Sequence, residues 1–201
     1  MFIKRQMVVV RDGAGRVLLH SAIALDERRM SQLEALGGLT WLVVPNGHHR
    51  LDAAAYRARF PSVVVIAPSG AVPRVREVVC VDLTYDQFPE HETLRFHTPP
   101  WATAKEGVLE IRDDRRTVLV FNDLLFNPVG SGSAEWVYRL LGLGPHVPWL
   151  AKRMFVRDKA RLRAWLQQLA EFERLDVVVP GHGDPITVDA GATLRAVAAG
   201  L

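Results

Sequence analysis

The sequence predicts an α/β fold, and three observations lead to this prediction. In the first half of the chain, apolar runs typical of strands alternate with segments of helical periodicity. In the second half, three strand-like runs follow one another with only short turns between them, and helical segments come after. An apolar run, a proline and a Gly/His turn occur together twice, as VVPNGHH at 43–49 and VVPGHGD at 178–184.

Length and composition predict one domain that spans residues 1–201. The net charge is only +3 and the basic residues are scattered, so we expect no nucleic-acid partner. The one cysteine, Cys80, excludes a disulfide framework or a Cys-rich zinc site, and its apolar surroundings predict a buried strand thiol. No apolar run approaches the ~20 residues that span a bilayer, and residues 1–10 do not resemble a signal peptide. We therefore expect a cytoplasmic protein with no membrane partner, and the Ala-, Arg- and Val-rich composition suggests a bacterial source.

The first elements each have a local signal. Residues 7–22 contain two β-rich runs around a DGAG turn, which predicts a hairpin. Residues 25–38 predict a helix with Asp26 as its N-cap and Gly37 at its end. Residues 40–45 then predict a buried strand.

The remaining elements follow from the same signals of periodicity and punctuation. Further strands are expected at 62–68, 77–83, 92–98, 107–113, 116–123 and 175–180, of which 92–98, 107–113 and 116–123 should pair antiparallel. Further helices are expected at 52–60 (ended by Pro61), 134–142, 157–172 and 188–200.

The polar residues that follow the apolar strands are the candidates for chemistry. His48 and His182 lie in the two repeated phrases, and Asp123 lies at the end of the strand expected at 116–123, just after its apolar residues 118–121. The carboxyl ends of parallel strands are where α/β folds place ligand groups. Two histidines and one carboxylate suit a divalent transition metal and leave positions open for water or substrate. The sequence therefore predicts His48, Asp123 and His182 as metal ligands, and Asp123 and His182 as catalytic residues.

Simpler explanations exist for several of these residues. Asp123 could cap the following turn, Asp52 is most simply a helix N-cap, and His49 is expected to be a surface turn histidine. His97 fits either a structural or a functional role. His182 lies between two glycines, where it is poorly placed for core packing, so a functional role is favoured. The three remaining histidines are expected to be surface or boundary residues: His20, His91 and His146.

Four stretches of the chain resemble motifs of the metallo-β-lactamase fold superfamily: VVPNGHHRL at 43–51, LRFHTPPW at 94–101, VLVFNDLLFN at 118–127 and VVVPGHGDPI at 177–186. In a narrower comparison, with VLLHSAIALDE at 17–27 and RFPSVVVIAP included, the chain resembles the DUF4336-like branch of this superfamily. The resemblance implies a four-layer αββα sandwich with an internal pseudo-two-fold. The two repeated phrases would then be equivalent turns facing one groove.

The resemblance also implies an atypical metal site. Where the superfamily has its H-x-H-x-D-H signature, this chain has Asn46, His48, Arg50 and Leu51, so only the second histidine is kept. Trp101 stands where another histidine is usual. Asp123 and His182 match the bridging aspartate and the last histidine. A binuclear centre cannot form by direct substitution, and a shift of one residue would offer His49 and Asp52 in place of the lost ligands.

Two functions follow from this pattern. The first is a metal-dependent hydrolase with at most one Zn²⁺ or Fe²⁺ on His48, Asp123 and His182, assisted by His49 or Asn46. The alternative is a metal-free pseudoenzyme or small-ligand-binding protein in which an Arg50–Asp123 ion pair replaces the metal and Trp101 fills the groove. A non-haem iron site is a weaker third reading.

The partner expected for any of these functions is a small molecule, which the sequence does not identify. The stretch 127–155 is rich in Trp, Leu and Gly and could form a helical cap, a hydrophobic pocket or a homodimer surface.

Overall fold

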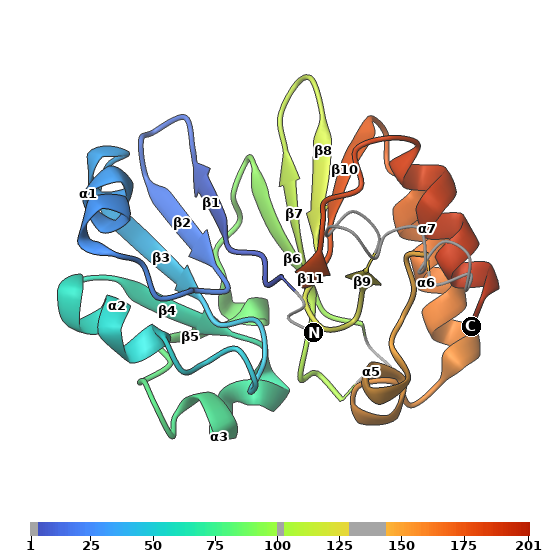
Figure 1. Cartoon of the computed structure of the whole chain (residues 1–201), viewed down its shortest axis with the longest axis horizontal. Coiled ribbons are helices and arrows are strands. Elements are labelled where there is room, and N and C mark those ends of the chain that lie inside the picture. The colour runs from blue at the N-terminus through green and yellow to red at the C-terminus, as the bar shows by residue number, and fades with distance from the viewer. Residues whose placement is uncertain (1–3, 100–102, 129–143) are drawn as a thin grey trace. The chain divides into compact units, whose positions relative to one another are not determined.

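The computed structural model describes residues 4–99, 103–128 and 144–201 (Figure 1). The chain divides into two compact units. The N-terminal unit is Met7–Pro89, and the C-terminal unit is Glu90–Leu201 together with the first six residues. Each unit has its own sheet and its own apolar core, so each is described by itself. The expectation of a single domain stays a prediction.

The N-terminal unit is built on a five-stranded sheet of order β1-β2-β3-β4-β5. β1 is antiparallel to β2, and the other neighbours are parallel. The helices pack on one face of this sheet, where Leu33, Tyr56 and Val75 join strand residues such as Leu19 and Leu42 in one core (Figure 1). The elements are β1 (Val8–Arg11), β2 (Val17–His20), α1 (Glu27–Ala35), β3 (Leu39–Val43), α2 (Ala53–Arg59), β4 (Val64–Ala67), η1 (Ser69–Ala71), α3 (Val72–Val75), β5 (Leu83–Thr84) and η2 (Tyr85–Gln87).

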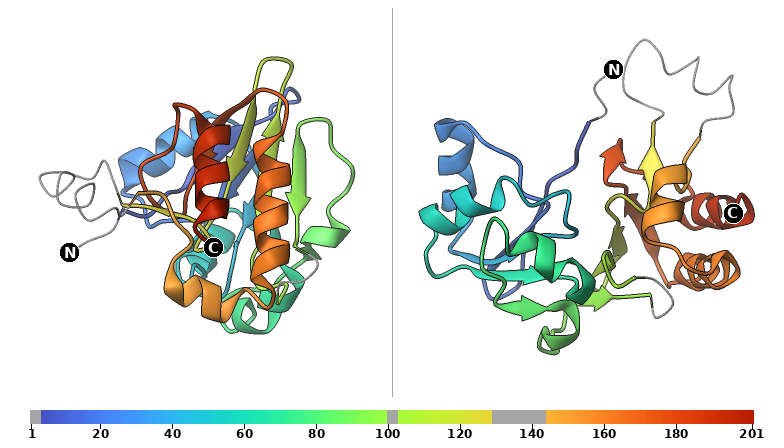
Figure 2. Two further views of the ribbon diagram at one scale, coloured as in Figure 1. Left: turned by 90° about the vertical axis from the view of Figure 1, so that its right-hand side faces the viewer. Right: turned by 90° about the horizontal axis from the view of Figure 1, so that it is seen from below.

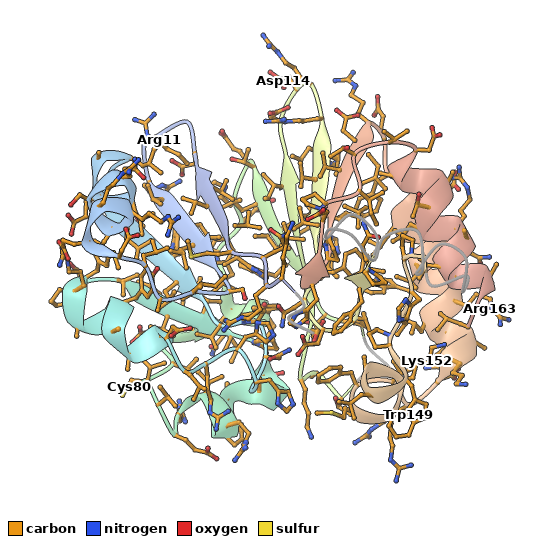
Figure 3. All side chains as sticks on the ribbon, viewed as in Figure 1. Arg11, Cys80, Asp114, Trp149, Lys152 and Arg163 are labelled. Carbon is orange, nitrogen blue, oxygen red and sulfur yellow. The ribbon has the colours of Figure 1, made fainter. Side chains whose placement is uncertain are left out.

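Most local signals of this unit are confirmed. The hairpin forms around its DGAG turn, and Asp26 caps α1 by accepting a hydrogen bond from the backbone N–H of Arg29. The strand expected at 77–83 is wrong except for its last residue, because the chain forms a turn after α3 there and joins the sheet only at β5. Cys80 is consequently exposed rather than a buried strand thiol, since the chain buries Val79 and Val81 on either side of it (Figure 3).

The C-terminal unit has a four-stranded sheet of order β10-β8-β7-β6 and a two-stranded sheet of β11 and β9. β6, β7 and β8 pair antiparallel as predicted, whereas β10 lies parallel to β8. Figure 2 (left) shows α6 and α7 side by side over the sheet. The elements are β6 (Leu94–His97), β7 (Val108–Arg112), β8 (Thr117–Val120), β9 (Phe126–Asn127), α5 (Trp149–Met154), α6 (Lys159–Ala170), β10 (Leu175–Val179), β11 (His182–Gly183) and α7 (Ala190–Ala199).

Helix α6 shows why this unit folds as the sequence predicts. Its i, i+4, i+7 stripe of Leu162, Leu166 and Leu169 is buried in the core with residues of the sheet and of α7. Asp158 caps its first turn by accepting from the N–H of Arg161. The helix expected at 134–142 lies outside the described residues. Among the helices that the structure describes, none is long and apolar enough to cross a bilayer.

Candidate metal centre

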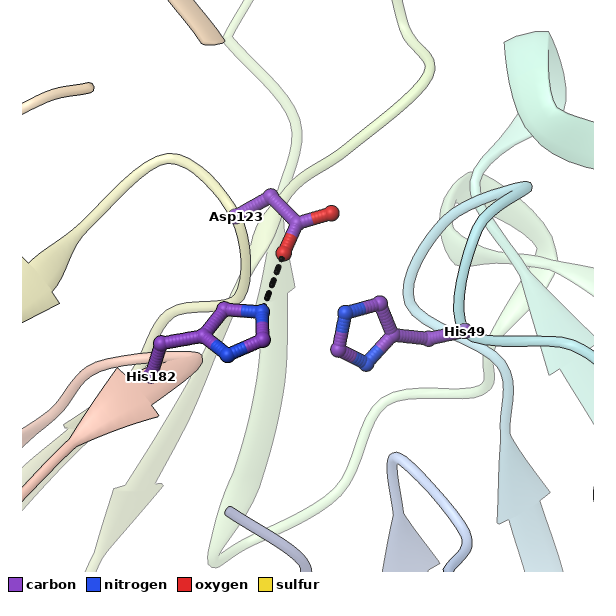
Figure 4. Close-up of side chains that lie close together, drawn as sticks. All are labelled: His49, Asp123 and His182. Carbon is purple, nitrogen blue, oxygen red and sulfur yellow. Dashed lines mark hydrogen bonds and ion pairs between the residues drawn. The ribbon is translucent and has the colours of Figure 1, made fainter. Parts of the chain in front are cut away.

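Asp123 and His182 lie side by side at one edge of the C-terminal unit. β8 and β10 are adjacent parallel strands, with Val120 opposite Val179, so their carboxyl ends reach the same edge of the sheet. Asp123 follows β8 and His182 follows β10, which brings His182 Nε2 to 3.1 Å from Asp123 Oδ1 (Figure 4). Both side chains are mostly buried, with exposed fractions of 17% and 16%. The sequence-based prediction that these two residues meet at a strand edge agrees with this geometry.

Two glycines place His182 in this position. Gly181 N donates to the carbonyls of Asn122 and Leu125, and a Cβ at Gly181 would lie 2.4 Å from the backbone of Asn122. Gly183 has φ +92°, and a Cβ there would lie 1.6 Å from the carbonyl oxygen of Asn127. The turn therefore packs directly against the loop that carries Asp123, and only residues without a side chain allow that approach.

The other side of the turn is held by the first residues of the chain. Gln6 N donates to Gly181 O at 3.1 Å, and Gly183 N donates to Lys4 O at 3.0 Å. The Gln6 side chain adds a hydrogen bond to Gly183 O at 2.6 Å. No sequence motif predicts this contribution of residues 4–6.

The donor set of this pair fits a divalent metal ion. An imidazole nitrogen and a carboxylate oxygen, both held by backbone pairing, are ligand types that Zn²⁺ and Fe²⁺ accept. The pair can also exist without an ion, as a hydrogen bond or ion pair between the two rigidly placed side chains. The geometry is thus suited to bind a metal or to hold and transfer a proton between His182 Nε2 and Asp123 Oδ1.

In the N-terminal unit, Asn46 organises the turn of the first repeated phrase. Its fully buried side chain accepts hydrogen bonds at Oδ1 from His48 N (2.8 Å) and His49 N (3.0 Å). The turn buries His49, which is 6% exposed, and exposes His48. The expectation that His49 is a surface histidine is therefore wrong. His49 Nδ1 lies 3.0 Å from the hydroxyl of Ser21, which follows β2. His48 as a metal ligand stays a prediction.

His20 corrects a second expectation. It is the last residue of β2 and is 1% exposed, not at the surface. Burial, and secondarily the charge of His49, lower the pKa of His20 to about 3, so this ring stays neutral. The sequence contains a signal for this burial, because the apolar run 17–19 leads without interruption into His20. In the structure all four residues of β2 are buried.

Arg50 binds within its own unit. Its guanidinium donates to Glu77 Oε2 at 3.1 Å and to the carbonyl of Gly47, and the side chain is only 14% exposed. The ion pair of Arg50 with Asp123 stays a prediction, whereas the sequence does not predict the pair with Glu77. The physical reason is that the turn after α3 brings a carboxylate to the turn after β3, a contact 27 residues apart that no local pattern reveals.

The surroundings of Asp52 are mainly structural. Asp52 lies at the N-cap position of α2, but its side chain makes no capping hydrogen bond, because its backbone (φ −82°, ψ −10°) is already helical. Burial, and then the nearby charge of Asp52, raise the pKa of Tyr56 to about 12. Trp101 lies outside the described residues.

His97 belongs to an ion-pair network of the C-terminal sheet. Its Nε2 lies 2.6 Å from Glu110 Oε2, and Glu110 Oε1 forms an ion pair with Arg112 Nη2 at 2.7 Å. Burial of Glu110 works to raise its pKa, but the hydrogen bond from His97 and the charges of Arg112, His97 and Arg95 outweigh burial, so the pKa is lowered. This network satisfies a buried carboxylate and needs no ligand to explain it.

No protein-family model matches the sequence, and no curated protein sequence matches it. Solved structures do match. The metallo-β-lactamase DIM-1 aligns with TM-score 0.62 and 14% identity over 98% of this chain and 88% of that one. A metallo-β-lactamase from Pontibacter korlensis aligns with TM-score 0.63 and 14% identity, and the alignment covers 99% of this chain and 89% of that one. The metallo-β-lactamase FIM-1 from Pseudomonas aeruginosa, in its mono-zinc form, aligns with TM-score 0.60 and 12% identity, and the alignment covers 98% of this chain and 84% of that one.

The chain accordingly has the metallo-β-lactamase fold, an α/β sandwich, as the sequence motifs predicted. The DUF4336-like branch is not tested by these structures and stays a prediction.

Proposed function

We propose that this protein is a metal-dependent hydrolase that holds one divalent metal ion, Zn²⁺ or Fe²⁺, at the Asp123–His182 pair. The observation that carries the proposal is the 3.1 Å approach of His182 Nε2 to Asp123 Oδ1 at the carboxyl ends of adjacent parallel strands. The metallo-β-lactamase fold supports it, because structures of that fold include one described as a mono-zinc form.

A histidine of the turn 46–50 is part of this proposal as a third ligand. The sequence favoured His48 for this role. The burial of His49, and the hydrogen bond of its Nδ1 to Ser21, are the surroundings typical of a ligating histidine, whose second ring nitrogen is normally hydrogen-bonded. We therefore propose His49 first and retain His48 as the alternative that mutation can test.

A bound ion would supply an activated water with a pKa near ~7 and would polarise a carbonyl or phosphoryl oxygen. The chain supplies the rest. The carboxylate of Asp123 orients the centre and can accept a proton from the attacking water at a carboxylate oxygen. In the metal-free protein, His182 Nε2 and Asp123 Oδ1 lie 3.1 Å apart, and the surrounding backbone pairs keep both side chains in place. With an ion bound, the lone pair of His182 Nε2 would face the ion in place of a proton shared with Asp123.

The substrate class that we propose is a small ester, lactone, β-lactam or phosphoester. β-Lactams are included because the matched structures are β-lactamases by name. A bacterial cytoplasmic location is also part of the proposal, because the single exposed thiol of Cys80 suits a reducing compartment.

The test is hydrolysis by protein that has been stripped with a chelator and reloaded with Zn²⁺ or Fe²⁺. Suitable probes are p-nitrophenyl acetate, a γ-lactone, nitrocefin and bis-p-nitrophenyl phosphate. We expect turnover of at least one probe that depends on metal and falls by about 100-fold or more in His182→Ala. His91→Ala, a histidine outside the centre, is the matched control and should keep the activity. Equal turnover with and without metal, or in His182→Ala, would contradict the proposal. No metal uptake would favour a metal-free binding protein.

A further inference from the structure

We propose that Ser21 is a positioning residue that fixes the ring of His49 with the proton on Nδ1, so that Nε2 presents its lone pair. This inference rests on the proposed metal site and assigns the group that orients one of its ligands. It concerns contacts within the N-terminal unit alone.

The backbone of Ser21 is the first observation. Ser21 is fully buried at the end of β2 and has φ +60°, the left-handed region that a serine seldom adopts. Its N–H donates to the carbonyl of Val43 at the end of β3, so the sheet itself holds this conformation. Strained backbone of this kind persists only where the surroundings enforce it, and it concentrates at functional sites.

The hydroxyl of Ser21 is the second observation. Its Oγ lies 3.0 Å from His49 Nδ1, and both side chains are buried. The backbone N–H of His49 is bonded to Asn46 Oδ1 at the same time. The ring is thus held at its main chain and at one ring nitrogen, which leaves it little freedom to rotate.

The chemistry of a neutral imidazole decides what this contact does. One ring nitrogen carries a proton and the other a lone pair. When Ser21 Oγ accepts from Nδ1–H, the lone pair lies on Nε2, and only this arrangement lets Nε2 bind a cation. A hydroxyl that donated to Nδ1 would leave the proton on Nε2 and exclude a ligand role. In the arrangement that we infer, Ser21 Oγ accepts the hydrogen bond from His49 Nδ1–H.

The test compares Ser21→Ala and Ser21→Gly. Both remove the hydroxyl, but glycine accepts a positive φ without strain and alanine does not, so the pair separates positioning from stability. Ser62→Ala, at an exposed serine, is the control. Two quantities are measured: the protonated ring nitrogen of His49, by long-range ¹H–¹⁵N correlation spectra of metal-free protein, and the Zn²⁺ affinity, by competition with a chromophoric chelator.

We expect Nδ1–H for His49 in the wild type and a shift towards Nε2–H in both variants. Zn²⁺ affinity should fall by roughly 10–100-fold in both, including the unstrained glycine variant. Nε2–H in the wild type, or variants whose tautomer and affinity equal those of the wild type, would overturn the inference. If the wild type takes up no Zn²⁺, the proposed function fails, whereas the spectra of the metal-free protein still decide the role of Ser21.

Discussion

The two units hold their candidate histidines in different ways. In the C-terminal unit, His182 is held by backbone pairing, with β9 on one side and residues 4–6 on the other. One glycine precedes it and another follows it. In the N-terminal unit, His49 is held by side chains, with Asn46 bonded to its main chain and Ser21 bonded to its ring.

This difference explains which part of the site is readable from sequence. The histidine of the C-terminal turn needs glycines next to it because the backbone of that turn packs closely, and the Gly-His-Gly pattern of residues 181–183 can be recognised in the sequence. A side-chain-held histidine depends on partners such as Ser21, 28 residues away, which leave no local signal. The difference also predicts that the two turns respond differently to mutation.

The largest expected effect is that of Gly183→Ala. Its Cβ would lie 1.6 Å from Asn127 O at a φ of +92°, so either the turn or β9 must move. We expect a loss of roughly 3 kcal/mol or more in the free energy of unfolding, measured by urea denaturation. Gly200→Ala is the control, because its Cβ would meet nothing closer than Val197 O at 3.6 Å, and it should change stability by less than about 1 kcal/mol. Equal effects would mean that backbone packing does not hold the C-terminal turn.

Asn46→Ala tests the side-chain-held turn. It removes the acceptor of two backbone N–H groups, those of His48 and His49, so we expect a loss of about 2–3 kcal/mol in urea denaturation. Asn46→Asp keeps an acceptor oxygen at the same place and should lose less. If aspartate and alanine destabilise equally, the hydrogen bonds at Oδ1 are not what holds this turn.

His20 gives the N-terminal unit a sensitivity to acid. The folded protein protonates His20 at a pKa of about 3, whereas the unfolded chain protonates it near 6.5, so between these values the unfolded state binds more protons. Stability must therefore fall as the pH drops below about 6.5, by about 2 kcal/mol between pH 7 and pH 5. In His20→Leu, which cannot titrate, the same urea measurements should show a correspondingly smaller loss. An unchanged pH dependence would contradict the neutral, buried state of this ring.

Much of the fold could be predicted because its signals are local. The hairpin at 7–22, the cap of α1 and the leucine stripe of α6 all follow from neighbouring residues. Asp123 and His182 could be paired because each follows an apolar strand and strands of one sheet end together.

The errors come from contacts between distant residues. Glu77 pairs with Arg50 because a turn after α3, which the local pattern does not predict, brings it there. The same turn exposes Cys80. The local pattern does not predict the burial of His20 and His49, because burial at the end of a parallel strand depends on the neighbouring strands and loops.

The Asp123–His182 pair is proposed to hold one metal ion. The most direct measurement is elemental analysis of tag-free protein purified without chelator and again after soaking in Zn²⁺ or Fe²⁺. The matched variants are His182→Ala, His49→Ala and His48→Ala. We predict about one metal ion per chain in the wild type, near-complete loss in His182→Ala and His49→Ala, and retention in His48→Ala. Absence of metal from the wild type under every condition, or an undiminished content in His182→Ala, would contradict the account.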